Sequence, residues 1–532
     1  MTSSSTVSTA APPAESAWFD RRGKLILLAL LVCVGAWIRV TNLQGVTDRS
    51  PDEAYYTWQV NTLLDHGTTD GYRVLFDHFD MNLPSPTRAG YHWLLMATMR
   101  LTGDRTPLAG ARLSCFVSIL ALALVAWIGW RFFSATVALV ATLLYGVYPA
   151  ELVLARRCWV EALVELLTLA SFAIAFDVMS GERRRLIYVP YVLLGVACIT
   201  VKETAAAAFL FATIGILLML VVRRERKAAL EFVGAGMGSA LLAAIFFAVR
   251  FGGLAQLSQF YKVTQTVSLP SDYSRDFESG SAAQLLQGMW SFSAVVTLLA
   301  LVGVVAAVVL LLRGAKDAEQ RARAQAALGM AVFCAAFLAL AVLVQKENFR
   351  HICGIFAPLM LLAGMGFQQL LTGVGLLLPV TEAGSVRVLL VAGLLGGAVY
   401  DLHRFHSEYA GPAMKDLSIR MVLQTSGSVM NAVVVPPTVG LPPTTADGWI
   451  QMSASLVQAG KNEEAIVAAK NALALDPKSA VAWNNIAAAD ENMQRWDEAI
   501  QAAQNALAIQ PGFQLAKNNL AWSVEQKRKQ GR

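Results

Sequence analysis

The chain has 532 residues, of which 56% are hydrophobic and only 15% are charged. Soluble proteins contain roughly 45–50% apolar and about 25% charged residues, so this composition excludes a soluble globular protein, a disordered chain and a fibrous one. The net charge of +6 would suggest a nucleic-acid partner in a soluble protein. In so apolar a chain, basic residues are first assigned to cytoplasmic loops, and we expect no nucleic-acid partner.

Residues 1–20 are interpreted as a disordered cytoplasmic tail, because residues 1–16 are rich in Ser, Thr, Ala and Pro. Arg21, Arg22 and Lys24 then precede an apolar run from Leu25 to Val40. No clear small-residue cleavage site follows this run. We therefore predict an uncleaved first transmembrane helix rather than a signal peptide.

Apolar runs that approach or reach the roughly 17–25 residues needed to span a bilayer recur through residue 400. The long run from Leu186 to Val222 predicts two crossings with a turn at Lys202 and Glu203. We predict eleven transmembrane helices, near residues 25–42, 109–130, 134–150, 158–178, 186–201, 204–222, 228–250, 290–312, 325–344, 353–372 and 385–400.

The basic residues predict the topology of this bundle. With a cytoplasmic N-terminus, every dense cluster of Lys and Arg between the predicted helices falls on the cytoplasmic side, as the positive-inside rule requires. Residues 43–108, residues 251–289 and everything after residue 400 are then extracytoplasmic. We expect a multi-pass protein of the cell inner membrane.

The C-terminal part contains a sequence repeat. Residues 401–447 are predicted to form a juxtamembrane segment and a semi-rigid, Pro-rich linker. An aromatic residue, two small residues and a proline then recur after 34 residues, which is the tetratricopeptide period. The matching pairs are Trp449 and Trp483, Ala465 and Ala499, Ala472 and Ala506, and Pro477 and Pro511. Residues 448–532 are predicted to form two tetratricopeptide repeats and a closing helix, so the fold class is all-α: a polytopic bundle followed by a small α-solenoid.

Candidate catalytic residues follow the first predicted helix. Asp52 and Glu53 adjoin, and Tyr55 and Tyr56 come directly after them. Loop carboxylates are usually only solvated, but two adjacent ones can supply a general base and a partner that orients it. The two tyrosines are candidates for contacts with acceptor or sugar, and so are Glu161 and His351 further along the chain.

Candidate anion-binding residues lie on the same predicted side of the membrane. Arg156 and Arg157 follow the third predicted helix, Lys202 occupies the turn between two others, and Arg350 precedes His351 in a further outside loop. Lone cations at membrane surfaces are often there only because their long side chains reach the headgroups. Several gathered beside a carboxylate suit the phosphate of a lipid-linked substrate.

Acidic residues also occur at helical spacing around these cations. Arg157, Glu161 and Glu165 are four residues apart and share a helix face. Glu165 falls inside a predicted span, where an ionisable residue is a functional hypothesis by default; the alternative is an ion pair that only holds helices together. The six cysteines show no metal-ligand or disulfide spacing. No cofactor or metal is expected, although divalent-metal dependence stays open.

These motifs, in this order, resemble the GT-C glycosyltransferases, and within them the branch of protein O-mannosyltransferases and lipid A aminoarabinose transferases. The resemblance covers residues 20–400 and rests on the Asp52–Glu53 pair, the stretch from Pro149 through Arg156 to Glu161, Lys202, the pair Arg350–His351, and the start of the second helix at Arg112. The appended repeats resemble animal O-mannosyltransferases that carry tetratricopeptide arrays. The chain departs from the family at Glu161, where Asp is frequent, and at His351, where Tyr is frequent.

The resemblance implies a donor sugar on polyprenyl phosphate and transfer to an acceptor hydroxyl with inversion. Asp52 would be the base and Glu53 its partner, although the sequence does not separate their roles. Lys202 and Arg350 would hold the phosphate, with Arg156 and Arg157 as further candidates. The resemblance also implies a hexosyl- or pentosyltransferase.

Three acceptors remain open: protein Ser or Thr, a lipid A-like glycolipid, or a growing polysaccharide. We expect the repeats to recruit an acceptor or a protein partner. The alternative function is a non-catalytic membrane anchor that presents the repeats as a scaffold. A scaffold has no need of eleven spans.

Overall fold

The computed structural model describes residues 21–43, 51–77, 84–179, 187–253, 281–314, 317–344, 348–410, 417, 422–423, 446–458 and 461–530. The predicted tail, the basic residues 183–185 and the linker at 433–445 lie outside these ranges. The chain divides into two compact units, Met1–Ser428 and Val429–Arg532. The first unit continues past the predicted boundary at residue 400, because its last long helix runs to Arg404.

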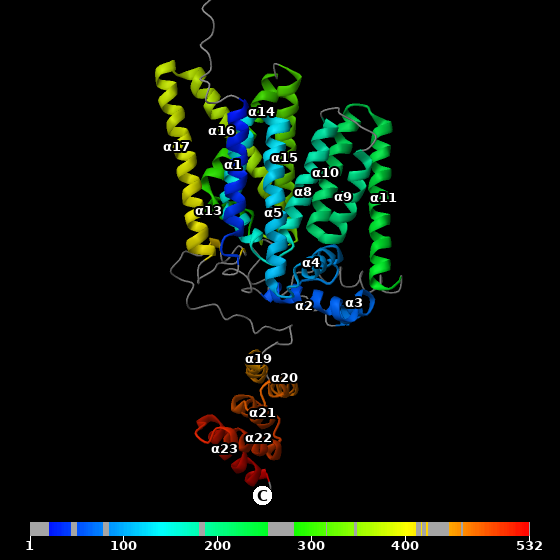
Figure 1. Ribbon diagram of the computed structural model, residues 1–532, viewed down its shortest axis with the longest axis vertical. Helices are drawn as coiled ribbons and strands as arrows, with labels where there is room; N and C mark the ends of the chain where they lie inside the picture. Colours follow the sequence, from blue (N-terminus) through cyan, green and yellow to red (C-terminus); the bar gives the residue numbers. More distant parts are fainter. Residues whose placement is uncertain are drawn as a thin grey trace, which may run out of the picture. The chain divides into compact units, whose positions relative to one another are not determined.

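The first unit is a bundle of long helices (Figure 1). Buried aromatic and aliphatic side chains fill its interior, whereas α1, α11 and α17 expose many leucines and valines as lipid-facing helices do. The long helices are α1 (Arg21–Val40), α5 (Pro107–Ile128), α6 (Ala135–Val147), α8 (Glu161–Met179), α9 (Tyr188–Val201), α10 (Glu203–Val222), α11 (Arg226–Phe251), α14 (Ala294–Arg313), α15 (Ala318–Leu343), α16 (Phe356–Leu377) and α17 (Val380–Arg404).

Among the described residues, eight helices are long and apolar enough to cross a membrane, or nine if the bent pair α6 and α7 (Pro149–Ala155) is one span. The chain is therefore a multi-pass membrane protein. A helix lies at each of the eleven predicted spans, but the predicted count exceeds this number for physical reasons. Helix α9 has only 14 residues, α8 contains three carboxylates, and the chain bends by 65° between α6 and α7.

Three shorter helices lie together across one end of the bundle: α2 (Pro51–His66), α3 (Thr68–Asp77) and α4 (Ala89–Thr102) (Figure 1). All three helices belong to the predicted outer segment 43–108. Their buried residues pack into the core of the bundle, including Tyr56, Tyr72 and Tyr91. The segment is thus a structured cover and not an open loop.

Shorter elements complete the first unit. They are the π-helix η3 (Gly129–Phe133), α13 (Ala282–Phe292), the 3-10 helix η6 (Cys353–Ile355) and the π-helix η7 (Phe405–Tyr409). The predicted turn between two spans is confirmed, because α9 ends at Val201, Lys202 is extended, and α10 begins at Glu203.

The second unit consists of five helices: α19 (Ala446–Gln458), α20 (Asn462–Leu475), α21 (Ala480–Asn492), α22 (Trp496–Ile509) and α23 (Gln514–Gln530). Consecutive helices pack against each other across short connections. The four repeated alanines at 465, 472, 499 and 506 are fully buried, which allows the paired helices to approach closely. The helix boundaries follow the predicted repeat, whereas its assignment as a tetratricopeptide module stays a prediction.

Candidate active site

The acidic pair occupies the first turn of α2. Pro51 begins the helix, where its missing N–H has no helical partner to lose, and the two carboxylates lie at the positive end of the helix dipole. Glu53 is fully buried: its Oε1 accepts from the backbone N–H of Cys158 at 3.0 Å, and its Oε2 from Arg157 Nη1 at 3.2 Å. Glu53 therefore attaches α2 to the segment that joins α7 to α8.

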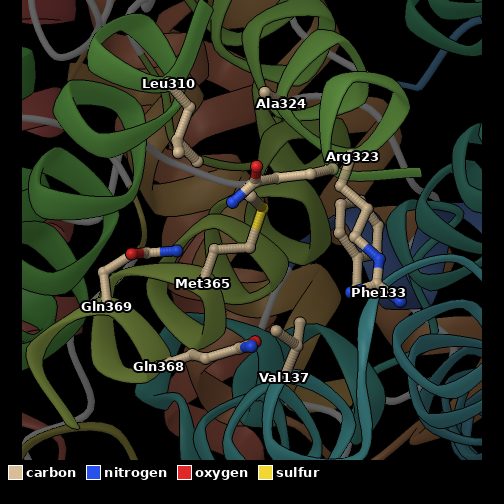
Figure 2. A pocket seen from close by; sticks show the side chains of 9 residues that line it. Phe133, Val137, Leu310, Arg323, Ala324, Met365, Gln368 and Gln369 are labelled. Carbon is tan, nitrogen blue, oxygen red and sulfur yellow. The ribbon is translucent and has the colours of Figure 1, made fainter. Parts of the chain in front are cut away.

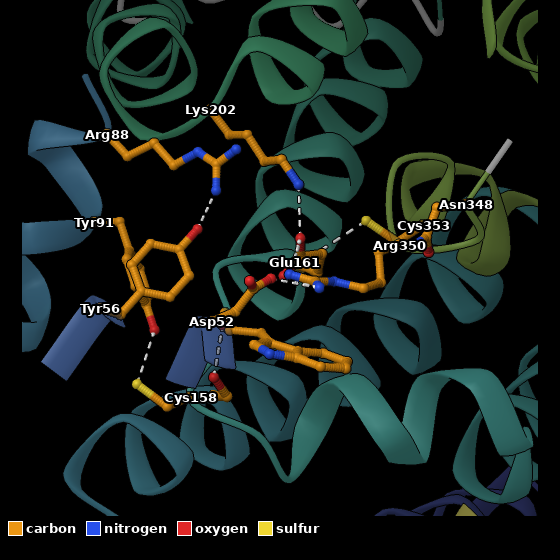
Figure 3. A network of polar contacts seen from close by, with 12 residues as sticks. Asp52, Tyr56, Arg88, Tyr91, Cys158, Glu161, Lys202, Asn348, Arg350 and Cys353 are labelled. Atoms are coloured by element: carbon orange, nitrogen blue, oxygen red, sulfur yellow. Dashed lines mark hydrogen bonds and ion pairs between the residues drawn. The ribbon is translucent and has the colours of Figure 1, made fainter. Parts of the chain in front are cut away.

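Asp52 points into a different set of contacts. Its Oδ2 lies 2.6 Å from Nη1 of Arg350. Nη2 of the same guanidinium lies 3.3 Å from Oε1 of Glu161, and that oxygen also accepts from Lys202 Nζ at 2.6 Å. We call Asp52, Glu161, Lys202 and Arg350 the outer cluster (Figure 3). The prediction that these residues converge on one side of the bundle is confirmed.

An aromatic ring supports the outer cluster. The guanidinium carbon of Arg350 lies 4.0 Å from the centroid of the Trp159 ring, and that of Arg157 lies 5.0 Å from it. Cation–π attraction is strongest on Trp and strengthens where water is excluded. Trp159 therefore supports Arg350 beside Asp52 through the face of its guanidinium, while Nη1 and Nη2 donate to the carboxylates of Asp52 and Glu161.

A second polar group lies beside Lys202. Arg88, just before α4, donates to the hydroxyl of Tyr56 and lies 3.9 Å from the carboxylate of Glu203. Tyr56 is fully buried, and burial raises the pKa of its phenol, which keeps it neutral at all physiological pH. Its ring packs edge-on against Tyr91. Arg88 and Tyr56 thereby form a fixed polar wall opposite Arg350.

A cavity of about 200 Å³ opens beside these groups. Its polar lining residues are Arg88, Lys202, Glu203, Thr204 and His351, and its remaining lining is apolar. The apolar residues come from α10 and α15 and from the segment before η6: Ala207, Phe337, Leu340, Ala341, Val344 and Ile352. Such a cavity matches a molecule with an anionic head and a hydrocarbon tail.

A smaller cavity of about 90 Å³ is lined by residues of η3, α6, α14, α15 and α16 (Figure 2). Its polar lining residues are Gln320, Arg323, Gln368 and Gln369. No residue predicted for the site lines it.

Other predicted residues have different surroundings. Arg156 donates to the backbone carbonyls of Ile38, Thr41 and Asn42, and Arg157 binds Glu53. Both side chains therefore hold structural segments together: Arg156 contacts the end of α1, and Arg157 attaches to α2 through Glu53.

The two predicted tyrosines and His351 also separate. Tyr55 is buried with its ring 5.1 Å from that of Trp58, whereas Tyr56 reaches Arg88. His351 is one of the residues that line the cavity beside Lys202. Of these three residues, Tyr56 contacts Arg88, and His351 lines the same cavity as Lys202.

Two residues of the site were not predicted from the sequence. Arg88 carried one usable signal, a cation in an outer segment where the charge rule disfavours it. Trp159 carried none, because an aromatic residue in a membrane domain is usually core. In the described residues, no group of three or more His, Cys, Asp or Glu side chains is arranged to hold a metal ion.

No protein-family model matches the sequence, and no curated protein matches it. The fold is similar to solved structures at low identity. ArnT from Cupriavidus metallidurans in the apo state is 15% identical, with 82% of this chain and 80% of that chain covered and a TM-score of 0.49. The same protein bound to undecaprenyl phosphate is 14% identical, with 91% and 80% covered and a TM-score of 0.46.

The archaeal oligosaccharyltransferase AglB from Archaeoglobus fulgidus, in complex with an inhibitory peptide and a dolichol-phosphate, is 10% identical with a TM-score of 0.44. The match covers 73% of this chain but only 56% of the archaeal chain. The function of this chain therefore has to be judged from its own residues.

Proposed function

We propose that this chain is an integral-membrane glycosyltransferase that moves a sugar from a polyprenyl-phosphate donor to an acceptor hydroxyl. One observation carries this proposal: two cations, Lys202 and Arg350, converge on the carboxylate of Glu161 beside Asp52, and Lys202 also lines a cavity with both charged and apolar lining residues. The phosphate of the donor would bind at Lys202 and Arg350. Its hydrocarbon would lie along α10 and α15.

The contacts of Glu161 support this assignment. Glu161 is fully buried, and among the described residues its second oxygen has no hydrogen-bond partner. Its contacts with Lys202 and Arg350 hold both cations in place while no phosphate is bound. A phosphate would receive donors from the same two side chains, one as a point charge and the other as a fork.

The proposed step is an inverting displacement. The carboxylate of Asp52 takes the proton of the acceptor hydroxyl as its oxygen bonds to the anomeric carbon. The bond from that carbon to the phosphate oxygen breaks, and Lys202 and Arg350 stabilise the charge on the departing polyprenyl phosphate. Asp52 is the stronger candidate for the base, because its side chain is 22% exposed whereas Glu53 is buried with both oxygens occupied.

We infer that the outer cluster faces the extracytoplasmic side of the cell inner membrane. Supporting residues are Arg21 and Arg22 at the start of α1 and Arg226 and Lys227 at the start of α11, since the helix ends rich in basic residues are expected in the cytoplasm. The helices that follow residue 446 would then also be extracytoplasmic. Their proposed role is to recruit a protein acceptor or partner, because repeat surfaces of this kind bind extended segments.

The full chain in nanodiscs tests the function directly. We would supply labelled monosaccharides on undecaprenyl phosphate, together with an extract of acceptors from a strain that lacks this gene. We expect release of undecaprenyl phosphate coupled to labelling of an acceptor. Tight donor binding without turnover on any donor would favour the non-catalytic scaffold instead.

The role of the second unit is tested with the identified acceptor. Removal of residues 446–532 should reduce transfer to a large acceptor more than transfer to a short soluble mimic. Equal loss on both acceptors would contradict recruitment and indicate a structural role.

A further inference from the structure

The break between α6 and α7 leaves backbone carbonyls that need donors. Pro149 has no N–H, so the carbonyl of Tyr145 lacks its helical partner, and the 65° bend also leaves that of Gly146 at a helix end. Arg39 of α1 supplies both donors, through Nη2 to Tyr145 O at 3.3 Å and Nη1 to Gly146 O at 3.2 Å. This guanidinium is fully buried.

The other donors of Arg39 are used as well. Nε lies 2.6 Å from the hydroxyl of Ser118 on α5, and Nη2 lies 3.2 Å from Glu151 Oε1 on α7. Ser118 also donates to that carboxylate oxygen. One arginine thus fixes the direction in which α7 leaves the end of α6.

The end of α1 is held by a second arginine, which comes from the residue after α7. Helix α1 ends at Val40, and a helix leaves its last four carbonyls without partners inside the helix. Arg156, which follows α7, donates to Ile38 O at 3.0 Å, to Thr41 O at 2.5 Å and to Asn42 O at 3.1 Å. The end of α6 therefore receives an arginine from α1, and the end of α1 receives an arginine from the residue that follows α7.

We propose that Arg39 and Arg156 form a reciprocal arginine clamp that positions Asp52 for transfer. The residues after Arg156 carry the argument: Arg157 and the N–H of Cys158 hold Glu53, which adjoins Asp52. The clamp fixes the end of α1, from which the chain leads to α2, against the segment that holds α2 itself. The inference rests on the proposed function only where turnover is concerned, because the geometry stands without it.

Lysine variants separate positioning from charge. In Arg39→Lys and Arg156→Lys the charge stays, but one ammonium does not reproduce a planar fork that bridges several carbonyls. Cys158 reports the result, because its thiol is buried beside the Glu53 contact. We expect its labelling by N-ethylmaleimide to rise about ten- to a hundredfold in both variants, since losing a charged hydrogen bond favours local opening.

Two internal controls and one matched variant sharpen the experiment. Cys198 and Cys334 are buried elsewhere in the bundle and should stay protected. Arg105→Lys changes an exposed pair with Asp65 and should leave all labelling unchanged. Where the wild-type chain turns over, kcat should fall by about a hundredfold in the clamp variants with little change in KM for the donor, as expected for a misplaced base.

Wild-type protection of Cys158 in both lysine variants would overturn the clamp, and so would labelling that rises equally at all three cysteines. Wild-type kcat with an exposed Cys158 would also overturn it, because positioning would then not matter. A wild-type chain that turns over no donor would contradict the proposed function alone, and the labelling pattern would still decide the clamp.

Discussion

Two clusters of charged side chains lie inside the apolar bundle, and they differ in access. The inner cluster consists of Arg39, Ser118, Tyr145, Glu151 and Glu165. Its arginine and carboxylates are at most 1% exposed, and none of its residues lines either cavity described above. The outer cluster has the same kinds of side chain, but Asp52 and Arg350 are 22% and 12% exposed and Lys202 lines a cavity.

A charge within a membrane bundle is therefore a weak sign of chemistry unless the charged group is exposed or lines a cavity. Glu165 illustrates the point. Its position inside a predicted span made it a functional candidate, yet its Oε2 accepts from the hydroxyl of Tyr145 at 2.5 Å, deep in the bundle. If exposure to solvent or to a cavity distinguishes the two clusters, variants of the outer cluster should change catalysis or binding, and variants of the inner cluster should change stability.

Asp52→Asn tests the chemistry of the outer cluster. The change keeps size and hydrogen bonding but removes proton acceptance, and general-base catalysis contributes about 10²–10⁴-fold. We expect kcat to fall by that factor while the affinity for donor stays near wild type. Glu53→Gln should lower kcat less if Glu53 only holds α2. Near-normal turnover in Asp52→Asn would place the base elsewhere.

Glu151→Gln tests the inner cluster as a structural group. The variant leaves Arg39 buried without its counter-charge, and breaking a buried pair destabilises by about 3–5 kcal/mol. We expect a clear fall in melting temperature, while the fraction that remains folded binds undecaprenyl phosphate normally. Weakened binding by fully folded protein would mean that the two clusters are not separate.

Lys202→Ala and Arg350→Ala test the phosphate site. Each removes a charged donor to the phosphate, and the loss is worth about 1.5–3 kcal/mol, or roughly ten- to a hundredfold in affinity. Binding of undecaprenyl phosphate to nanodiscs measures this change, with Arg105→Ala as the exposed control. Wild-type affinity in both variants would contradict the site as described.

His92 on α4 gives the smallest effect, in the helices that cover the outer cluster. Burial lowers the pKa of this imidazole from 6.5 to about 3, and its ring contacts Gln59 and Tyr72. Because the unfolded chain takes up a proton on this imidazole near pH 6.5 and the folded chain does not, the free energy of unfolding is highest above about pH 6.5. It falls as the pH drops towards 3. The expected slope is about 1.4 kcal/mol per pH unit.

The measurement is the melting temperature at pH 7.5 and at pH 5, in the wild type and in His92→Gln. Glutamine keeps a hydrogen-bonding side chain without titrating in this range. We expect the wild type to lose more stability than the variant on acidification. Equal pH dependence in both would show that His92 is not the titrating group.

Much of the architecture was predictable because it depends on composition along the chain. The apolar runs indicated a helix at each predicted span, and the topology placed Asp52, Lys202 and Arg350 at the same end of the bundle. In the structure Arg350 contacts Asp52, and Glu161 joins Arg350 to Lys202. The 34-residue spacing likewise predicted two repeats and a closing helix in residues 448–532, and five described helices lie between Ala446 and Gln530.

The remaining features depend on partners that leave no pattern in the sequence. Arg156 was taken for a phosphate ligand because its side chain matches that chemistry, whereas its partners are three backbone carbonyls. Any residue type offers a carbonyl, so no spacing reveals such a contact. The same holds for Arg39, and for the bend at Pro149 that creates carbonyls in need of donors.

Trp159 contacts two guanidinium groups, which gives the site an optical signal of its own. The emission of an indole depends on the electric field across its ring, and Arg350 is the closer of its two cations, at 4.0 Å. A ligand that draws Arg350 towards itself changes this field without any label. The difference between the emission spectra of the wild type and Trp159→Phe would therefore isolate one indole among 12 tryptophans and follow occupancy in real time.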